Sequence, residues 1–319
     1  MSKMLFVMDP IESININKDT TFVIMLECQA RGHEIRYCKL EDLFVKDSRA
    51  WADSTTLRLE KKSDYYSKGS TETSPLDDFD VVWMRKDPPF NMDYIYSTYI
   101  LSRVDESATR VINHPAGIRE SNEKMYSLNF ADYIPPTLVS KDIGKLKEFL
   151  SQVGNEMVIK PLDGYGGEGI FLVRAEDPNL NVILESITDF GRTYVMAQRF
   201  IKEVSQGDKR VILLNGQPIG SVMRVAAKGE FRSNFHSGGH PEKTSLTERD
   251  LEICDGLRQK LIDDRLYLVG IDIVGGYLTE VNTTSPTCVQ EINFFSGTKL
   301  ESQIVDFAES IICNPPVNR

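Results

Sequence analysis

Cysteine and histidine are scarce in this 319-residue sequence, which contains five cysteines and four histidines. The cysteines are odd in number, lie far apart and show no Cys-x-x-Cys spacing. Disulfide frameworks and zinc sites need paired or closely spaced cysteines, so the sequence predicts reduced thiols with structural roles. None of the histidines stands beside an evident serine or cysteine nucleophile, and a covalent enzyme intermediate is therefore not indicated.

Long apolar runs and long basic runs are absent as well. The first apolar run, residues 4–8, is followed at once by Asp9 and Pro10 and falls far short of the ~20 residues of a membrane-spanning helix. It also lacks the layout of a signal peptide. Lys and Arg total 37 against 47 Asp and Glu, a net charge of −10 that disfavours nucleic acid as a partner. We expect a cytoplasmic protein with no membrane and no nucleic-acid partner.

The chain is 41% apolar and 26% charged, which is enough to bury a core divided among two or three subdomains. Its start reads as a strand at residues 5–8, a helix capped by Asp19 or Thr20 and stopped at Gly32, and a second strand from Ile35. Strands alternate with helices over roughly the first 120 residues, which predicts a small doubly wound domain. Residues 51–78 are polar and predict an irregular excursion or an exposed hairpin.

A second architecture begins after Pro135 and Pro136. It is rich in predicted strands with glycine-containing turns, framed by helices near residues 143–153, 247–263 and 299–313. The sequence as a whole therefore predicts an α/β protein with α+β character.

A glycine-rich loop follows the predicted strand at residues 157–160. Four glycines lie within residues 164–169, and successive backbone N–H groups in such a loop can point at one anion. The next segment, residues 170–173, is a predicted strand, whereas a Walker A motif or a dinucleotide fingerprint requires a helix there. We interpret the element as a hairpin lid over a triphosphate, with Lys160 at its base. An ordinary flexible hairpin is the alternative.

Two neighbouring segments support a nucleotide site. Residues 194–198 predict a strand that runs into residues 199–201, an edge whose backbone groups could bind an adenine. Residues 207–210 precede a strand, an Asn-Gly turn and a returning strand that carries Arg224.

The hairpin at residues 269–282 gives the strongest chemical signal. Glu280 and Asn282 lie two residues apart on one strand and so share a face. A two-residue turn at residues 275–276 would pair Asp272 with Thr279 and put the two carboxylates on opposite faces. A three-residue turn at residues 275–277 would pair Asp272 with Glu280, and we favour it because three oxygen ligands then converge as a Mg²⁺ site requires. A solvated acidic face is the alternative.

Several short segments carry a family resemblance: MDPI at 8–11 with NINKDT at 15–20, MRKDPPF at 84–90, NEK at 122–124, KPLDGYGGEGIF at 160–171, GDKR at 207–210 and TEVNTTSPTC at 279–288. In these segments the sequence resembles the bacterial glutathione synthetases of the ATP-grasp superfamily, over nearly the whole chain. The glycine loop and the acidic hairpin alone would indicate only an ATP-grasp enzyme. MRKDPPF and the TSPT stretch narrow the resemblance to glutathione synthesis.

The resemblance implies an ATP-grasp fold preceded by a small doubly wound, Rossmann-like domain of the pre-ATP-grasp type. The implied domains are residues 1–122, a central subdomain with the glycine loop at 123–202, and a C-terminal subdomain with the metal hairpin at 203–319. The implied reaction joins γ-glutamylcysteine and glycine, with ATP and Mg²⁺ (or Mn²⁺), to give glutathione, ADP and phosphate. The family also suggests a homotetramer.

The resemblance further implies roles for individual residues. The metal ligands would be Asp272, Glu280 and Asn282, and the catalytic arginines Arg210, Arg224 and Arg232. The substrate residues would be Asn15, Arg85, Ser285 and Thr287. The nucleotide would be bound by Lys124, Lys160, Gly164, Tyr165, Gly166, Gly167, Glu168, Gly169, Gln198, Arg199, Phe200, Ile201 and Asp208. His240 stands where a close relative has arginine, so it receives no role.

An acyl phosphate is the expected intermediate, since a carboxylate has no good leaving group, and it must be protected from water. Residues 226–240 combine glycines with polar residues and few apolar anchors beyond Phe231 and Phe235, so we expect a mobile lid. A long loop without function is the alternative. Two other functions compete with ours: another ATP-grasp ligase, or a nucleotide-binding regulatory protein that has lost its chemistry. The complete set of predicted ligands disfavours the second.

Overall fold

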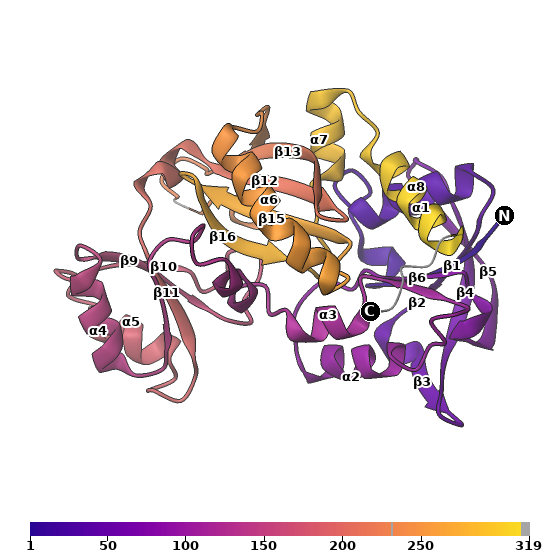
Figure 1. Ribbon diagram of the computed structural model, residues 1–319, viewed down its shortest axis with the longest axis horizontal. Coiled ribbons are helices and arrows are strands. Elements are labelled where there is room, and N and C mark those ends of the chain that lie inside the picture. The colour runs from indigo at the N-terminus through magenta and orange to yellow at the C-terminus, as the bar shows by residue number, and fades with distance from the viewer. Residues whose placement is uncertain (231, 314–319) are drawn as a thin grey trace.

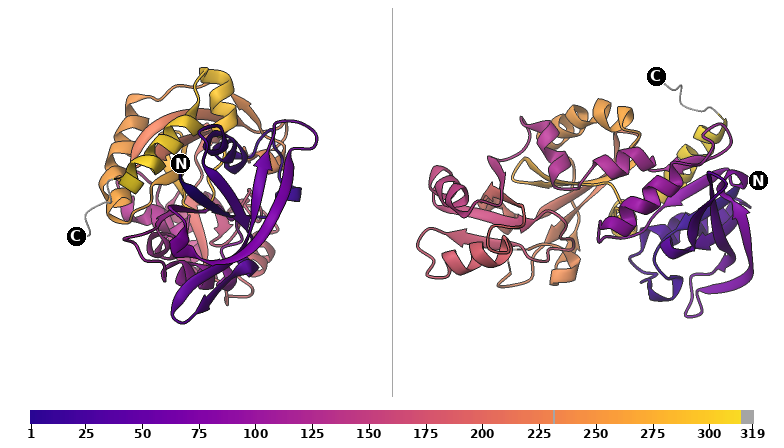
Figure 2. Two further views of the ribbon diagram at one scale, coloured as in Figure 1. Left: turned by 90° about the vertical axis from the view of Figure 1, so that its right-hand side faces the viewer. Right: turned by 90° about the horizontal axis from the view of Figure 1, so that it is seen from below.

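The computed structural model of the protein describes residues 1–230 and 232–313. Its strands form a seven-stranded, a four-stranded and a five-stranded sheet. The four-stranded and seven-stranded sheets lie at opposite ends of the molecule, with the five-stranded sheet between them (Figures 1 and 2). Short 3₁₀ helices connect the elements at Ile11–Ser13, Leu40–Asp42, Leu76–Asp78, Met125–Phe130, Lys202–Gln206 and Phe235–Ser237. Within the described ranges no helix combines the length and the apolar character that a bilayer crossing needs.

The first sheet confirms the predicted doubly wound start. Its parallel part runs in the order β2 (Glu34–Cys38), β1 (Lys3–Val7), β6 (Val81–Met84), β7 (Arg110–Ile112). Helix α1 (Thr20–Ala30) packs on one face, and α2 (Met92–Leu101) packs on the other with α3 (Pro115–Glu120) beside it. Asp19 caps α1 by accepting from the backbone N–H of Phe22 at 2.6 Å, as the sequence indicates.

The polar segment at residues 51–78 forms a hairpin, so the hairpin alternative is confirmed and the irregular one is wrong. Strand β4 (Arg49–Leu59) pairs with β3 (Leu43–Lys46), β2 and β5 (Tyr66–Pro75). Most of β5 is exposed. In contrast, β4 alternates, and it buries Ala50, Ala52, Leu57 and Leu59. Ala50 and Ala52 join one buried cluster, whereas Leu57 and Leu59 follow a register shift between Thr55 and Leu57 and join the other.

The second sheet is antiparallel in the order β10 (Phe171–Arg174), β9 (Glu156–Pro161), β11 (Val195–Arg199), β8 (Thr137–Ser140). Helices α4 (Ile143–Gln152) and α5 (Leu180–Ile187) cover one face and share a separate core with it. Strand β11 confirms the predicted strand at residues 194–198 and lies inside this sheet, and residues 199–201, into which it runs, line the pocket described below. Both of its sides are occupied by strand partners.

The third sheet runs β14 (His240–Glu242), β13 (Gln217–Val225), β12 (Asp208–Leu214), β15 (Leu268–Val274), β16 (Tyr277–Asn282). Helix α6 (Glu248–Asp263) starts with a capping box between Thr247 and Asp250. Helices α7 (Val289–Ser296) and α8 (Leu300–Cys313) then return to the first sheet, where α8 packs along α1 (Figure 1). Arg31 at the end of α1 pairs with Asp306 at 2.6 Å and Glu309 at 2.9 Å on α8.

Candidate active site

A pocket that opens to solvent lies where the second sheet faces the third. Strands β9 and β11 contribute one wall, and β15 and β16 contribute the other. The predicted site residues that line it are Lys124, Lys160, Gly164, Tyr165, Gly166, Gly167, Glu168, Gln198, Arg199, Phe200, Ile201, Asp208, Arg232, Asp272 and Glu280. The structure therefore brings most of the predicted nucleotide residues together with two of the three predicted metal ligands.

The glycine-rich loop forms the roof of this pocket between β9 and β10. Gly166, Gly167 and Gly169 have φ values of +61°, +86° and +66°, a region that favours glycine. Gly169 is not among the lining residues, but Ile170 beside it is. At Gly167 a Cβ would lie 2.8 Å from Asn234 Oδ1, so the loop touches the 226–240 segment closely.

The β15–β16 hairpin pairs Asp272 with Glu280, as predicted, but not by the predicted turn. The turn has two residues, Gly275 and Gly276, with φ of +56° and +78°, and it pairs Val274 with Tyr277. A bulge at Thr279 then shifts the register by one residue. Thr279 stabilises the bulge by donating from its hydroxyl to the Asp272 carbonyl at 3.1 Å. Our three-residue turn was wrong, and the bulge is what places both carboxylates on one face.

Asp272 is a buried carboxylate held by two arginines. Arg210 donates to it from Nε at 2.5 Å and from Nη2 at 3.0 Å, and Arg224 Nη2 lies 2.9 Å from it. Burial alone would raise the pKa of Asp272, but the two guanidinium groups hold that pKa well below its ordinary value. Arg224 also bonds Asp208, whose pKa is raised to about 6 by burial against the opposing effect of Arg224. Asp208 Oδ1 and Arg224 Nε are buried without a hydrogen-bond partner.

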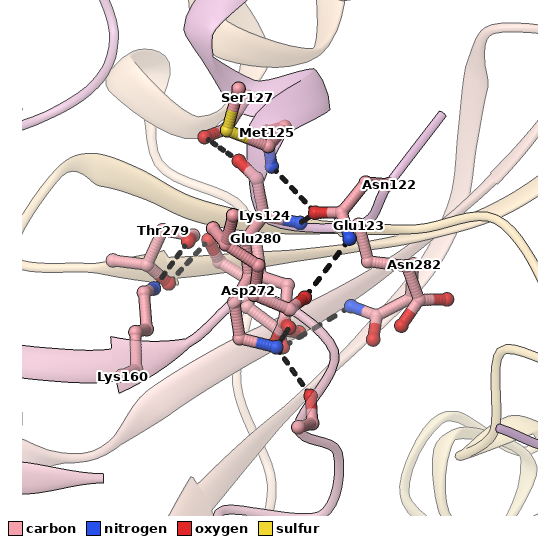
Figure 3. Close-up of polar contacts among 12 residues, drawn as sticks. Asn122, Glu123, Lys124, Met125, Ser127, Lys160, Asp272, Thr279, Glu280 and Asn282 are labelled. Carbon is pink, nitrogen blue, oxygen red and sulfur yellow. Dashed lines mark hydrogen bonds and ion pairs between the residues drawn. The ribbon is translucent and has the colours of Figure 1, made fainter. Parts of the chain in front are cut away.

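Two lysines reach β16 from the other side of the pocket (Figure 3). Lys124 Nζ lies 3.1 Å from Glu280 Oε1 and also donates to the Gly164 carbonyl. Lys160 Nζ donates to the Thr279 carbonyl at 3.0 Å. Burial lowers the pKa of Lys160 to about 8, with Glu280 offsetting part of the effect. Both cations sit at the base of the glycine loop, where an anion would meet them.

The donor set at the hairpin suits a hard divalent cation. Asp272 and Glu280 supply carboxylate oxygens, and Asn282 supplies an amide. Asn282 Nδ2 donates to the Gly270 carbonyl at 3.1 Å and to Asp272 Oδ2 at 3.3 Å, which orients the amide. The part of the chain that the structure describes holds no group of three His, Cys, Asp or Glu that could bind a metal.

The predicted substrate residues lie outside this pocket, around the start of α1. Arg85 is buried, which lowers its pKa, and it bridges Thr21 Oγ1 at 3.1 Å and the Pro286 carbonyl at 3.0 Å. Ser285 bonds Asp87. Asn15 is exposed in the loop before α1, and Thr287 is exposed before α7. Arg85 therefore links α1 to the segment at residues 285–287, which carries Ser285 and Thr287.

The 226–240 segment lies over the glycine loop. Arg232 donates to the Gly167 carbonyl at 3.0 Å and pairs with Glu230 at 2.7 Å. Phe235, one predicted anchor, packs on the core beneath α1, while Phe231 lies outside the described residues.

Sequence reasoning missed several lining residues. Ser233 is buried with a hydroxyl that has no hydrogen-bond partner, and Asn234 lies beside it. Val158 and Val274 line the pocket with Pro135, Ile170, Val204 and Thr279. A period-two signal could have found two of them, because Val158 lies two residues from Lys160 and Val274 two from Asp272.

Solved structures share this fold. D-cycloserine synthetase DcsG superimposes with a TM-score of 0.67 at 15% identity, covering 97% of this chain and 99% of that one. D-alanyl-alanine synthetase A from Vibrio cholerae gives 0.64 at 16% identity, covering 98% and 99%. At such identity the likeness shows the fold. With the pocket and with the family models, the fold defines an ATP-grasp enzyme, an ATP-dependent carboxylate–amine ligase.

The particular family follows from two sequence models. The model of the prokaryotic glutathione synthetase N-terminal domain matches residues 2–119, and that of the prokaryotic glutathione synthetase ATP-grasp domain matches residues 123–297. Curated proteins named glutathione synthetase are similar over nearly their whole length: 44% identity for Thermosynechococcus vestitus (94% of this chain, 97% of that protein) and 43% for Salmonella typhimurium (97% and 99%). The chain belongs to the prokaryotic glutathione synthetase family.

Proposed function

We propose that the chain joins γ-glutamylcysteine to glycine with ATP, giving glutathione, ADP and phosphate. The observation that carries this proposal is the similarity to curated glutathione synthetases across both the N-terminal and the ATP-grasp parts of the chain. The pocket between the second and third sheets supports it with cations, a glycine loop and paired acids.

The reaction needs an activated carboxylate. Transfer of the γ-phosphoryl group of ATP to the dipeptide carboxylate forms an acyl phosphate, which the glycine amine attacks with release of phosphate. Lys124 and Lys160 would bind nucleotide phosphates beneath the glycine loop, since both reach β16, Lys160 from strand β9 and Lys124 from the residue before the 3₁₀ helix Met125–Phe130. Arg210 and Arg224 would stabilise charge that develops on the transferred group.

The metal in this proposal is Mg²⁺, with Mn²⁺ as the alternative. Asp272, Glu280 and Asn282 would hold it. When bound, such a cation neutralises negative charge on the phosphate oxygens. Arg210 and Arg224 support this role for Asp272, since they hold the pKa of its carboxyl well below the ordinary value.

The adenine would lie along residues 198–201, against the apolar side chains of Val158 and Val274, with Asp208 nearby. The dipeptide would lie toward the N-terminal domain, held by Asn15, Arg85, Ser285 and Thr287. Arg232 would carry the lid over both substrates and exclude water from the acyl phosphate. Its contact with the Gly167 carbonyl supports a joint movement of lid and glycine loop.

The remaining parts of the proposal concern the whole protein. We place it in the cytoplasm as a homotetramer. We propose three domains, at residues 1–122, 123–202 and 203–319. Helices α7 and α8 belong to the third domain by sequence but pack against the first.

A coupled ADP-release assay tests the function. We expect ADP only when γ-glutamylcysteine and glycine are both present, in amounts equal to the glutathione formed. Equal turnover with D-alanine or free glutamate as the acid would identify another ATP-grasp ligase. Tight ATP binding without ADP release, whichever carboxylic acid is supplied as substrate, would identify a regulatory protein.

A further inference from the structure

Glu123 is a half-buried carboxylate beside the metal hairpin (Figure 3). We propose that Glu123 is a positioning residue, which fixes the end of β16 and thereby the proposed metal ligands relative to Lys124. This inference rests on the proposed metal site. Among the described residues, Glu123 forms no hydrogen bond with Asp272 or Asn282.

Strand β16 needs such a support because it is the edge strand of its sheet. The outward N–H groups of an edge strand lack a strand partner. Here the chain at residues 123–133 supplies the acceptors: the Tyr133 carbonyl accepts from Leu278 at 2.8 Å, and the Glu123 carbonyl accepts from Val281 at 3.0 Å. The Glu123 carbonyl therefore binds β16 at Val281, the residue between the proposed ligands Glu280 and Asn282.

The side chain of Glu123 extends this support beyond the strand. One oxygen, Oε1, accepts from the N–H of Thr283 at 3.1 Å, the N–H of Thr284 at 3.2 Å and the hydroxyl of Thr284 at 2.8 Å. An ionised carboxylate accepts and does not donate, so it suits a site where only donors converge. These donors belong to the residues that directly follow the proposed ligand Asn282.

The neighbours of Glu123 bond the other side of the pocket. Asn122 Nδ2 donates to the Leu162 carbonyl at 3.0 Å, and Asn122 Oδ1 accepts from the N–H of Lys124 at 3.2 Å. Lys124 reaches the Gly164 carbonyl and Glu280. Residues 122–124 thus bond the glycine loop and the metal strand at the same time. Losing the Glu123 carboxylate would leave three donors without an acceptor and free the end of β16 to move relative to Lys124.

The test measures metal affinity directly, with Mn²⁺ as the probe and ADP present, by electron paramagnetic resonance. Supports of metal ligands typically contribute ~10- to 100-fold to metal affinity. We expect E123A to raise the Mn²⁺ dissociation constant at least ~10-fold and the Mg²⁺ concentration for half-maximal ADP release in parallel. The KM for γ-glutamylcysteine at saturating Mg²⁺ should stay unchanged. E123Q keeps an acceptor oxygen and should rescue most of the affinity.

The controls separate this inference from the function on which it rests. E280Q removes a proposed ligand and must weaken Mn²⁺ binding; if it does not, the proposed metal site is wrong. If E280Q weakens binding but folded E123A binds Mn²⁺ normally, only the role of Glu123 is wrong. Should E123A not fold, T284V decides, because it removes one of the three donors. A normal Mn²⁺ dissociation constant in T284V would then overturn the inference.

Discussion

At the residue scale, the two carboxylates of the β15–β16 hairpin have different basic neighbours. Asp272 pairs with Arg210 and Arg224, whereas among the described residues Glu280 forms an ion pair with Lys124 and lies close enough to Lys160 to offset part of the lowering of its pKa by burial. Asp272 therefore stays ionised well below neutral pH, and its charge is largely balanced within the protein. Glu280 keeps a side chain that is 21% exposed, so it is the carboxylate more open to a ligand in the pocket.

Replacing Glu280 by Gln should abolish ligation while leaving the fold intact. The substitution keeps the size of the side chain but removes the charge of a proposed metal ligand, and misplacing a metal costs several kcal/mol of transition-state stabilisation. We expect a loss in kcat of about 10² or more, measured by ADP release. Circular dichroism should show an unchanged fold. Near-normal activity at saturating Mg²⁺ would show that Glu280 is not a ligand.

Lys160 should make nucleotide binding depend on pH. Its pKa of about 8 lies below the ordinary value for lysine, so the unliganded protein loses this charge as the pH rises through 8. Binding of a phosphate would then require proton uptake, and the dissociation constant for ADP should rise by up to ~10-fold per pH unit above pH 8. Titration calorimetry between pH 7 and 9 measures this. K160R, which stays charged, should show a flat profile; an equal slope in K160R would assign the effect to another group.

At the element scale, the turn between β15 and β16 has two glycines with different surroundings. A Cβ at Gly275 would lie 2.7 Å from the Ile201 side chain, whereas at Gly276 the nearest atom would be Arg249 Cγ at 3.4 Å. Both have positive φ, so either alanine variant should lose ~1 kcal/mol of stability. Only G275A should also displace Ile201 and weaken ATP binding. Thermal melts and ATP titrations of the two variants check this, and equal ATP affinity would contradict it.

The lid should respond to ligands as one element with the glycine loop. Arg232 reaches the Gly167 carbonyl, but this contact is polar and partly exposed, so ligand must stabilise it. Trypsin should cut after Lys228 or Arg232 in the protein alone, and more slowly with ATP, Mg²⁺ and dipeptide. R232A should lose protection at Lys228 and hydrolyse more ATP per glutathione formed. Unchanged cleavage with confirmed nucleotide binding would refute the lid.

At the scale of the whole molecule, local chemistry predicted the limits of helices and strands better than it predicted how the strands pair. The Asp19 cap and Gly32 fixed the limits of α1 from neighbouring residues alone. The internal position of β11 and the bulge at Thr279 depend on contacts with distant strands, including the bond from Lys160 to the Thr279 carbonyl. A bulge changes register without changing the pattern of side chains before it, so counting turn residues could not reveal it.

The oligomeric state that we propose is a homotetramer. We expect sedimentation equilibrium to give a mass four times that of the 36.1 kDa chain. If subunit contacts support the lid or the first domain, catalytic activity should persist on dilution down to the protein concentration at which the tetramer dissociates. A monomeric mass at micromolar concentration with full activity would contradict the tetramer.

The return of α8 to α1 bears on how the protein is made. Ile304 and Ala308 share one buried cluster with Phe22 and Ile24, and Arg31 bonds α8. During synthesis the first domain leaves the ribosome well before α8 does, so the apolar surface of α1 that α8 covers stays exposed in the meantime. We therefore expect the core of the first domain to close only after α8 has been released.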